Sequence, residues 1–495
     1  MANRITFPLI LIISVLSTNN LKPQNPFEIH LNLPGFQYVR NIFEVENNNY
    51  VAICNHDFTY NMPVNNSLFL KFSDENNITE YAIQKQDTVT NITKGFTKDN
   101  GNYFLMGFIR DTLDPETLTK LYICEVDSGF TIVWEKMFDV PEQHKKIRLI
   151  NYKISNNGII TMEGHFIPIS EKETDPYLFF VKLTVEGEML GNNYNSKYQS
   201  INLDEDIIIK NDNSGYYLFD NVKDSLGWSF DWLSIDTNLN IIDRGGFYGT
   251  WNFFGSYVTV RKLSNNNLLY ISHNGGTFYY DVIDVRISDM DLNFLKDTML
   301  IRQDTNMYPG SYNGMDFISE DEIFVVGYTP GFMFLPGSTD YKIYVLDSEL
   351  NFKGAKIYGG ETRYAILNLL ATSDGGCIVG GAVPDFEGSY DSDIYIRKIM
   401  TGDIYTHAEE TPNPNDRDVS VWPNPFRDII SVYTHRKGLR FQLYGENGKM
   451  VLQVGILPNQ ANNINSGFVP KGAYVYKLIS IEGDKIVQTG KLIKH

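Results

Sequence analysis

A short sequence pattern recurs about every 55 residues through most of this 495-residue chain. Each copy is a polar or glycine-containing turn followed by an apolar run, which is typical of a buried β-strand. The steps between copies are 53, 56, 57, 52, 55 and 54 residues. Their first apolar residues are Tyr50, Tyr103, Ile159, Tyr216, Leu268, Ile323 and Cys377. So regular a spacing predicts a repeat architecture, because each copy must form the same structural unit.

A second apolar run follows each copy, and several of these runs end in a turn of similar composition. Residues 236–240, 289–293 and 347–351 each begin with Asp and end with Asn. Asp and Asn favour such turns because their side chains hydrogen-bond to nearby backbone amides. Units of about 50 residues with several strands each are typical of propeller blades. We therefore predict an all-β protein in which residues 26–405 form a seven-bladed β-propeller.

The ends of this region predict how the ring closes. The last copy leaves little room for an outer strand before a polar, proline-containing segment at 406–417, which we interpret as a linker. Residues 27–33 form a strand-like run that belongs to no other blade. We expect this N-terminal strand to complete the seventh blade, because pairing the two ends leaves no open strand edge.

Residues 418–495 form a second region with its own strand pattern. The runs 429–433 and 473–477 mix β-branched and aromatic residues between Gly and Asn turns. Pro423 and Pro425 lack backbone donors, so the entry to this region cannot be a central strand. We predict a separate small β-domain here.

The C-terminal region also contains a series of motif residues. They are, in chain order, Pro423, Asn424, Pro425, Gly448, Lys449, Gly472, Tyr474, Gly490, Lys491 and Lys494. The series resembles the type A sorting domain of the Bacteroidota type IX secretion system. The resemblance implies a small immunoglobulin-like β-sandwich that binds the secretion machinery and directs the chain across the outer membrane, to the cell surface or the medium. An ordinary β-sandwich accessory domain, such as a carbohydrate-binding one, is the alternative.

The N-terminus favours the same route. Residues 5–16 are an apolar run behind the single cation Arg4, which is typical of a signal peptide. We place its end near residue 17, or as late as about residue 24, and a buried strand is the alternative. The run is too short to span a bilayer, and no other segment is long and apolar enough for a transmembrane helix.

Charge is distributed unevenly along the chain. The net charge is −18, with +5 on residues 418–495 and −24 on residues 18–417. Because a body with this much negative charge repels the phosphate backbone, we predict no nucleic-acid partner. Anionic membrane surfaces are disfavoured for the same reason.

The three cysteines, Cys54, Cys124 and Cys377, each lie in an apolar run. We expect buried free thiols that pack as small hydrophobic side chains. One disulfide with one remaining thiol is the alternative in an oxidising location. The sequence has no CxxC motif or Cys/His cluster, so it gives no support for a zinc site.

Four residues are candidates for ligand contact. His56, His165 and His273 follow the first apolar residue of their blades by five or six positions, and Arg110 lies in the matching place of the second blade. We expect them to emerge at equivalent strand ends on one face of the ring. Alternate blades lie too far apart to share one metal ion, so we predict a ligand-contacting rim and no metal site. Unrelated solvated loop histidines are the alternative.

The sequence contains no GxSxG, HExxH, P-loop or dinucleotide-binding motif, and we predict no cofactor. Two functions remain open. The favoured one is a non-enzymatic module that binds glycan or protein through aromatic-rich loops at 228–232, 247–254 and 328–334. The alternative is a propeller hydrolase or lyase that acts on extracellular polysaccharide, for which no carboxylate pair can be singled out among 60 acidic residues.

Overall fold

The structure is a computed structural model. It describes residues 26–32, 37–56, 67–83, 85, 87–111, 119–139, 144–155, 157–168, 177–200, 206–210, 214–224, 227–246, 259–274, 282–300, 307–329, 339–360, 362–385, 391–405, 419–422, 426, 429–434, 436–445, 448–458, 462–481 and 485–494. The expected signal peptide, the linker at 406–417 and the motif Pro423-Asn424-Pro425 lie outside the described residues.

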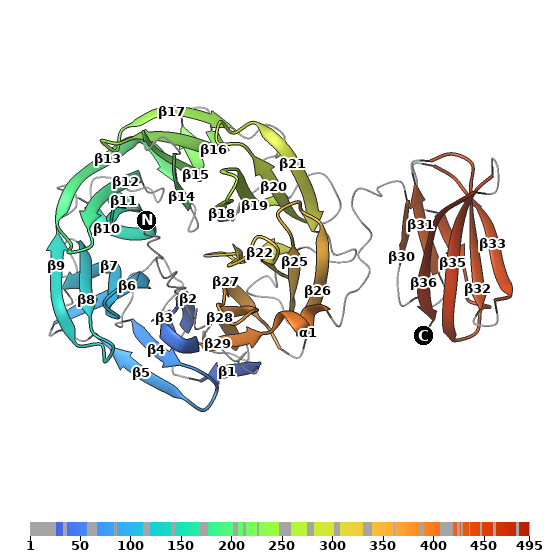
Figure 1. Cartoon of the computed structure of the whole chain (residues 1–495), viewed down its shortest axis with the longest axis horizontal. Helices are drawn as coiled ribbons and strands as arrows, with labels where there is room; N and C mark the ends of the chain where they lie inside the picture. The colour runs from blue at the N-terminus through green and yellow to red at the C-terminus, as the bar shows by residue number, and fades with distance from the viewer. Residues whose placement is uncertain are drawn as a thin grey trace, which may run out of the picture.

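The body is a β-propeller-like ring of antiparallel sheets, each of which runs from the centre of the ring to its rim (Figure 1). The first sheet is β2 (Gln37–Glu44), β3 (Tyr50–His56), β4 (Leu68–Phe72) and β5 (Ile78–Ala82), with the short 3-10 helix η1 (Glu46–Asn48) between β2 and β3. The next is β6 (Thr88–Thr97), β7 (Tyr103–Asp111), β8 (Lys120–Val126) and β9 (Ile132–Phe138).

The following two groups of strands are joined into one sheet. They are β10 (His144–Ile154), β11 (Ile159–Pro168), β12 (Tyr177–Thr184) and β13 (Met189–Ser200), then β14 (Asp206–Ile209), β15 (Gly215–Asp224), β16 (Gly227–Asp236) and β17 (Ile241–Gly246). The end of β13 pairs with β15 through Gln199 and Ser200. The residues 228–232, expected in an aromatic loop, lie instead within β16, because the hairpin of β15 and β16 extends beyond the repeat.

Three more groups complete the ring. They are β18 (Thr259–Lys262), β19 (Leu268–Asn274), β20 (Val282–Ser288) and β21 (Phe294–Leu300); β22 (Tyr308–Pro309), β23 (Met315–Asp316), β24 (Ile323–Tyr328), β25 (Asp340–Leu346) and β26 (Phe352–Gly359); and β27 (Ala365–Ala371), β28 (Cys377–Asp385) and β29 (Asp391–Ile399). Each first apolar residue of the repeat begins, or lies next to the start of, the second strand of a group, where β22 and β23 count as one inner strand because both pair with β24.

The two ends of the ring region pair with each other. Strand β1 (Phe27–Leu31) is antiparallel to β29 and forms the rim strand of the sheet β1-β29-β28-β27. Phe27 and Ile29 are buried, and Glu28 forms an ion pair with Arg397 at 3.2 Å. The predicted closure by the N-terminal strand is confirmed, although the strand ends at Leu31. The short helix α1 (Thr401–Tyr405) follows β29.

Apolar clusters fill the spaces between neighbouring sheets. Because side chains alternate along a strand, a single strand supplies two clusters. In β12, Phe179 and Val181 pack toward the sheet of β6–β9, whereas Leu178 and Phe180 pack toward β14–β17. Most inner strands are thus buried on both faces, which explains their nearly continuous apolar runs.

The recurring Asp turns have the local structure that their composition predicted. The Oδ1 atom of Asp289 accepts hydrogen bonds from the backbone amides of Asp291 and Asn293, at 2.9 and 2.8 Å. Asp236 and Asp347 make the same pair of bonds in their own turns. These bonds offset the cost of a positive φ at the apolar fourth residue, which is +65° at Leu292.

The C-terminal region contains two sheets around its own core. The first consists of β30 (Val419–Trp422), β31 (Ile429–Thr434) and β34 (Asn462–Asn465). The second is β33 (Met450–Ile456), β32 (Leu439–Gly445), β35 (Gly472–Ser480) and β36 (Ile486–Lys494). Buried Phe426, Ile430, Phe441 and Leu478 belong to one apolar cluster between them, as in a β-sandwich.

All three cysteines are buried and none forms a disulfide, so the prediction of free thiols is confirmed. Burial raises the pKa of Cys124 and of Cys377 to about 12 each, so both remain thiols at neutral pH. Over the described ranges, no helix has the length and apolar character needed to cross a membrane.

Candidate functional site

Four inner strands of the ring share a local distortion that is followed by a polar residue. Strands β2, β6, β10 and β27 each contain a β-bulge at the same place relative to the second strand of their group. A bulge adds one residue and re-aims the side chains next to it. The residues that directly follow the extra residue are Asn41, Lys94, Asn151 and Asn368.

Several of these polar side chains join one inner strand to the next. Asn368 Nδ2 donates to the Val39 carbonyl at 2.8 Å, and Asn41 Oδ1 accepts from the Gly95 amide at 3.2 Å. Further around the ring, the Thr259 hydroxyl accepts from the amide of Gly314 at 3.0 Å. These bonds satisfy backbone groups at the inner edges of the sheets and hold the walls of the centre in place.

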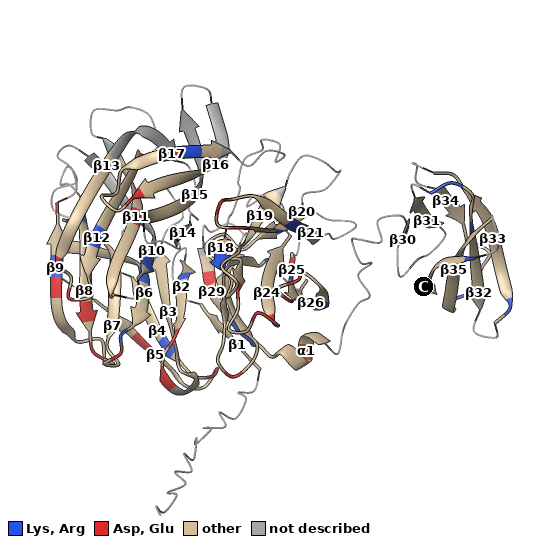
Figure 2. Ribbon diagram, turned by 45° about the horizontal axis from the view of Figure 1, so that its top comes forward, with Lys and Arg blue, Asp and Glu red and all other residues tan. Residues whose placement is uncertain are grey.

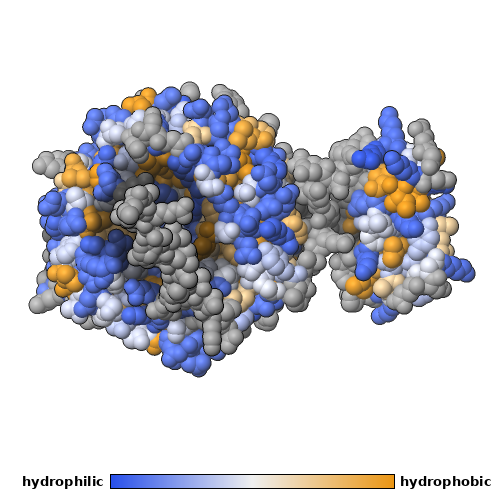
Figure 3. Space-filling model, in the orientation of Figure 1, coloured by the Kyte–Doolittle hydropathy of each residue, from blue (hydrophilic) through white to orange (hydrophobic). Residues whose placement is uncertain are grey.

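A cavity of about 320 Å³ opens between these inner strands. Ten residues line it: Asn41, Lys94, Asn151, Tyr152, Lys153, Ile154, Thr259, Arg261, Tyr312 and Asn313. They come from β2, β6, β10, β18 and the segment between β22 and β23. In Figure 3, the visible face of the ring is mostly hydrophilic. A volume of this size is sufficient for a small ligand.

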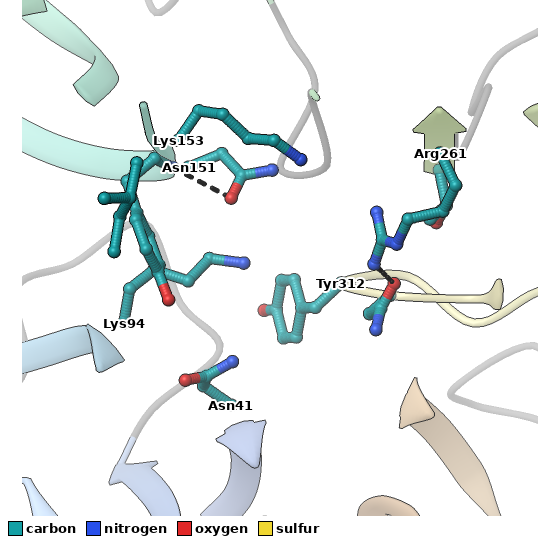
Figure 4. Close-up of a pocket in the computed structure, with 10 residues that line it drawn as sticks. Asn41, Lys94, Asn151, Lys153, Arg261 and Tyr312 are labelled. Carbon is teal, nitrogen blue, oxygen red and sulfur yellow. Dashed lines mark hydrogen bonds between the residues drawn. The ribbon is translucent and has the colours of Figure 1, made fainter. Parts of the chain in front are cut away.

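Three cations face one another across the cavity. Figure 4 shows Lys94 and Lys153 on one side and Arg261 on the other, with Tyr312 between them. None of the described lining residues is acidic. The wall thus contributes three cations to the centre of an acidic body, and Figure 2 shows Lys and Arg on the inner strands β2, β6, β10 and β18.

Arg261 is held in place by two neighbours. Its Nη2 donates to Asn313 Oδ1 at 2.7 Å, and its Nε lies 3.5 Å from Asp316 Oδ1. Burial raises the pKa of Asp316, and the charge of Arg261 opposes that shift. Asp316 also accepts from the amide of Ala371 at 3.0 Å, so the guanidinium is anchored to β27 through this carboxyl group.

Tyr312 supplies an aromatic surface in the wall. The guanidinium carbon of the buried Arg40 lies 3.6 Å from the centre of its ring, in the geometry of a cation–π contact. Tyr38 packs beside it with ring centres 6.0 Å apart. Tyr312 N donates to the carbonyl of Leu367 at 2.7 Å, which fixes the backbone that presents the ring.

The four residues predicted from the repeat lie apart from this cavity wall. His165 is buried in β11, and His273 is buried in β19 with its ring stacked on Tyr308 at 4.2 Å. Both histidines lie within strands and are buried, so neither is the solvated loop histidine of the alternative. Arg110 is half-buried near the end of β7, and the His56 side chain lies outside the described residues. Ligand contact by these four stays a prediction.

The cavity residues were missed because the repeat was anchored on the second strand of each unit. These residues lie seven to ten positions before those anchors, four of them in inner strands and Asn313 between β22 and β23: Asn41, Lys94, Asn151, Arg261 and Asn313. The inner strands contain several other polar residues, as in β6 (TVTNITKGFT), so no sequence signal singles these positions out. In the described part of the chain, no group of three His, Cys, Asp or Glu side chains is placed to hold a metal ion.

In the C-terminal region, the described motif residues have structural roles. Gly448 and Gly472 adopt φ values of +72° and +151°, which side chains other than glycine disfavour. Tyr474 is buried and donates to the carbonyl of Pro470 at 2.5 Å. A Cβ atom at Gly490 would lie 2.6 Å from the ring of Tyr476, so only glycine fits there.

The last motif residues close the β-sandwich and add charge to its surface. Lys494 is buried, and its ammonium donates to the carbonyls of Ser466 at 2.6 Å and Gly467 at 3.2 Å. Phe426 forms an isolated parallel bridge with Lys494, and its ring contacts that of Tyr474 edge-on, with ring centres 6.1 Å apart. Lys449 and Lys491 are exposed. The motif therefore combines fixed turns, a core contact and surface cations.

Comparison with known proteins identifies this region. The family model described as a secretion system C-terminal sorting domain matches residues 420–495. No curated protein matches the chain.

Several solved structures resemble the chain at low identity. PorZ, a surface component of the type IX secretion system of Porphyromonas gingivalis, is 9% identical, with 92% of this chain and 81% of that chain covered and a TM-score of 0.23. The β-propeller domain of the Trilobed protease from Pyrococcus furiosus is 10% identical, with coverages of 73% and 93% and a TM-score of 0.40. The GH93 α-L-arabinofuranosidase of Fusarium graminearum is 12% identical, with coverages of 77% and 99% and a TM-score of 0.38.

The matched region contains the glycine turns, the buried Tyr474, and the hydrogen bonds from Lys494 to the carbonyls of Ser466 and Gly467. Such a domain directs export to the cell surface or the medium. Residues 420–495 are a C-terminal sorting domain of the type IX secretion system, and they follow a propeller-like all-β body.

Proposed function

We propose that this is an exported surface or extracellular protein whose body, residues 26–405, is a seven-bladed propeller that binds a glycan at its centre. The cavity lined by polar side chains from several inner strands is the observation that carries the proposal. The blade count is supported by the repeat spacing, by the apolar clusters between neighbouring sheets, and by the pairing of β1 with β29.

The proposed route of export uses both ends of the chain. A signal peptide at residues 1–17 takes the chain to the periplasm of a Bacteroidota cell, and the sorting domain, which begins near residue 418, then engages the type IX machinery. The segment at 406–417 is the linker between the two functions. The family match to residues 420–495 supports the second step.

The chemistry of the cavity favours a glycan over a protein ligand. Asn41, Asn151 and Asn313 offer amides that can both donate and accept, which suits the hydroxyl groups of a sugar. A stable protein partner buries about 800 Å² of surface on each side. The wall of a cavity with a volume of about 320 Å³ is too small to supply that area. The walls of the cavity are also held by cross-sheet hydrogen bonds, so the site is preorganised.

The test is retention of the purified full-length chain on a panel of extracellular polysaccharides, with assays for new reducing or unsaturated ends. Asn151→Trp fills the cavity, whereas Asn192→Trp adds the same side chain at an exposed position of β13. We expect retention by the native chain and by Asn192→Trp, and loss of retention in Asn151→Trp with an unchanged melting temperature. Equal retention by both variants would place the ligand outside the cavity and contradict the proposal.

The same assay decides between the binding module and the alternative, a hydrolase or lyase. Glycoside hydrolysis normally needs two carboxyl groups at the scissile bond. Retention without new chain ends supports a binding module. New reducing or unsaturated ends that disappear in Asn151→Trp would establish the alternative.

A further inference from the structure

We infer that the cavity selects a saccharide that bears carboxylate groups, taken as a short oligosaccharide or as the end of a chain. The inference rests on the proposed glycan-binding function and deepens it by naming the class of ligand. The three cations of the cavity wall, Lys94, Lys153 and Arg261, carry it.

Lys94 is informative because its structural equivalents are asparagines. Asn41 and Asn368 occupy the same position after the bulge in β2 and β27, and each bonds to the backbone of the next inner strand. At the same position in β6, the longer Lys94 reaches into the cavity (Figure 4). Only 7% of Lys94 is exposed, so its charge is held at the wall of the cavity. Since asparagine serves the fold at the equivalent positions, the lysine points to a requirement for positive charge.

Arg261 adds geometry to that charge. Its contacts with Asn313 and Asp316 fix the plane of the guanidinium group from one side. A planar, preorganised guanidinium recognises the two oxygens of a carboxylate better than a flexible ammonium does. Lys153, across the cavity from Arg261 in Figure 4, supplies a second cation. The pair suits a ligand with carboxylates at more than one place.

The neutral part of the wall suits the rest of a sugar. The side-chain amides of Asn41, Asn151 and Asn313 match hydroxyl groups, and the aromatic ring of Tyr312 offers an apolar surface for the C–H groups of a pyranose. Cations, amides and an aromatic ring together fit a uronic acid better than a neutral hexose.

The charge of the whole chain limits the length of the ligand. With a net charge of −18, the outer surface repels a long polyanion, and the repulsion grows with the number of carboxylates outside the cavity. A short acidic saccharide escapes most of that repulsion while it gains the attraction of the three cations. We therefore expect short uronides to bind more tightly per residue than the polymer.

The experiment is titration calorimetry of the full-length chain with trigalacturonate and with its carboxyl-reduced, neutral counterpart. We expect trigalacturonate to bind at least tenfold more tightly than the neutral sugar. Lys94→Asn copies the residue at the equivalent positions, and Lys153→Gln removes the second cation; each should weaken trigalacturonate binding about tenfold and weaken neutral-sugar binding much less. Lys120→Gln, at a half-exposed position of β8 whose ammonium pairs with Asp139, is the matched control and should change neither.

The results of these titrations test the acidic-saccharide inference separately from the proposed glycan-binding function. Equal binding of both sugars, or no effect of Lys94→Asn and Lys153→Gln in chains with native melting temperatures, would overturn the inference and leave the proposed function standing. Binding of neither these sugars nor any member of the polysaccharide panel would overturn both. Binding of triglutamate in place of trigalacturonate would also overturn the inference, since the cavity would then recognise an acidic peptide.

Discussion

The ring and the C-terminal domain reveal their roles in different ways. The domain has motif residues that are close in sequence and act locally: Gly490 makes room for Tyr476, and Lys494 closes the sandwich on Ser466. The candidate site of the ring draws residues from β2, β6, β10, β18 and the segment after β22, more than 270 positions apart along the chain. A short motif can therefore identify the domain, whereas the site of the ring appears only once the sheets are assembled.

The two regions also differ in what holds them together. In the ring, stability depends on contacts between distant repeats and on one pair of strands at the chain ends. In the domain, a single core lies between two sheets. Changes to the ring closure should therefore affect the whole ring, and changes to the domain should remain confined to it.

The largest expected effect follows from removing β1. Deletion of residues 26–31 exposes the apolar surface buried by Phe27 and Ile29 and leaves β29 as an open edge. Loss of these two side chains alone costs about 5 kcal/mol, which is comparable with the whole stability of a domain. We expect the melting transition of the ring to fall by many degrees or to disappear, while that of the C-terminal domain stays in place. Two unchanged transitions in a calorimetric scan would refute closure by β1.

A smaller effect tests the electrostatics of the ring. Burial acts to raise the pKa of Glu125, but hydrogen bonds from Lys98, Asn102 and their neighbours outweigh it and lower the pKa to about 2. The carboxylate therefore contributes stability that is fully present above its usual pKa of 4.5 and is lost as pH falls toward 2.

Glu125→Gln should reveal this contribution. We expect the free energy of unfolding of the ring to be about 3 kcal/mol lower in the variant at pH 6, with the difference shrinking steadily between pH 4.5 and pH 2. Urea unfolding at several pH values measures it. A difference that does not change with pH would show that the carboxylate charge is not the source of the stability.

The smallest expected effect is in the C-terminal domain. Gly490→Val forces a branched side chain against the ring of Tyr476, and overpacking of this kind costs about 1–3 kcal/mol. Gly455→Val is the control, because a Cβ atom there meets nothing within 4 Å. We expect the first variant alone to lower the melting transition of the domain and the amount of secreted protein, with the ring unaffected. Equal secretion by both variants, despite a lower transition in Gly490→Val, would separate sorting from the packing of this motif.

The sequence predicted a good deal of the fold. The repeat located the second strand of every unit, from Tyr50 to Cys377, because these strands are long, apolar and buried on both faces. The Asp turns and the closing strand were also predictable, since each depends on a local pattern. The joining of β13 to β15 and the extension of β16 through Trp228 were not, because long strand pairings leave no distinct periodicity.

The candidate site was harder to predict. Lys94 is one lysine among many in the sequence, and its importance comes from a β-bulge that turns it toward the centre of the ring. Arg261 acquires its orientation from Asn313 and Asp316, which lie more than 50 residues later. The histidines were found by their register in the repeat, but register does not tell whether a side chain faces a neighbouring sheet or the solvent. Only the assembled ring distinguishes these cases.

The most direct test of the account is a crystal structure of the full-length protein with bound trigalacturonate. We expect the sugar to lie in the central cavity, with one of its carboxylates at the guanidinium group of Arg261. At least one lysine, Lys94 or Lys153, should lie within hydrogen-bonding distance of the sugar. A sugar bound on the rim, on the C-terminal domain or on an outer strand, with the central cavity filled only by water, would contradict it.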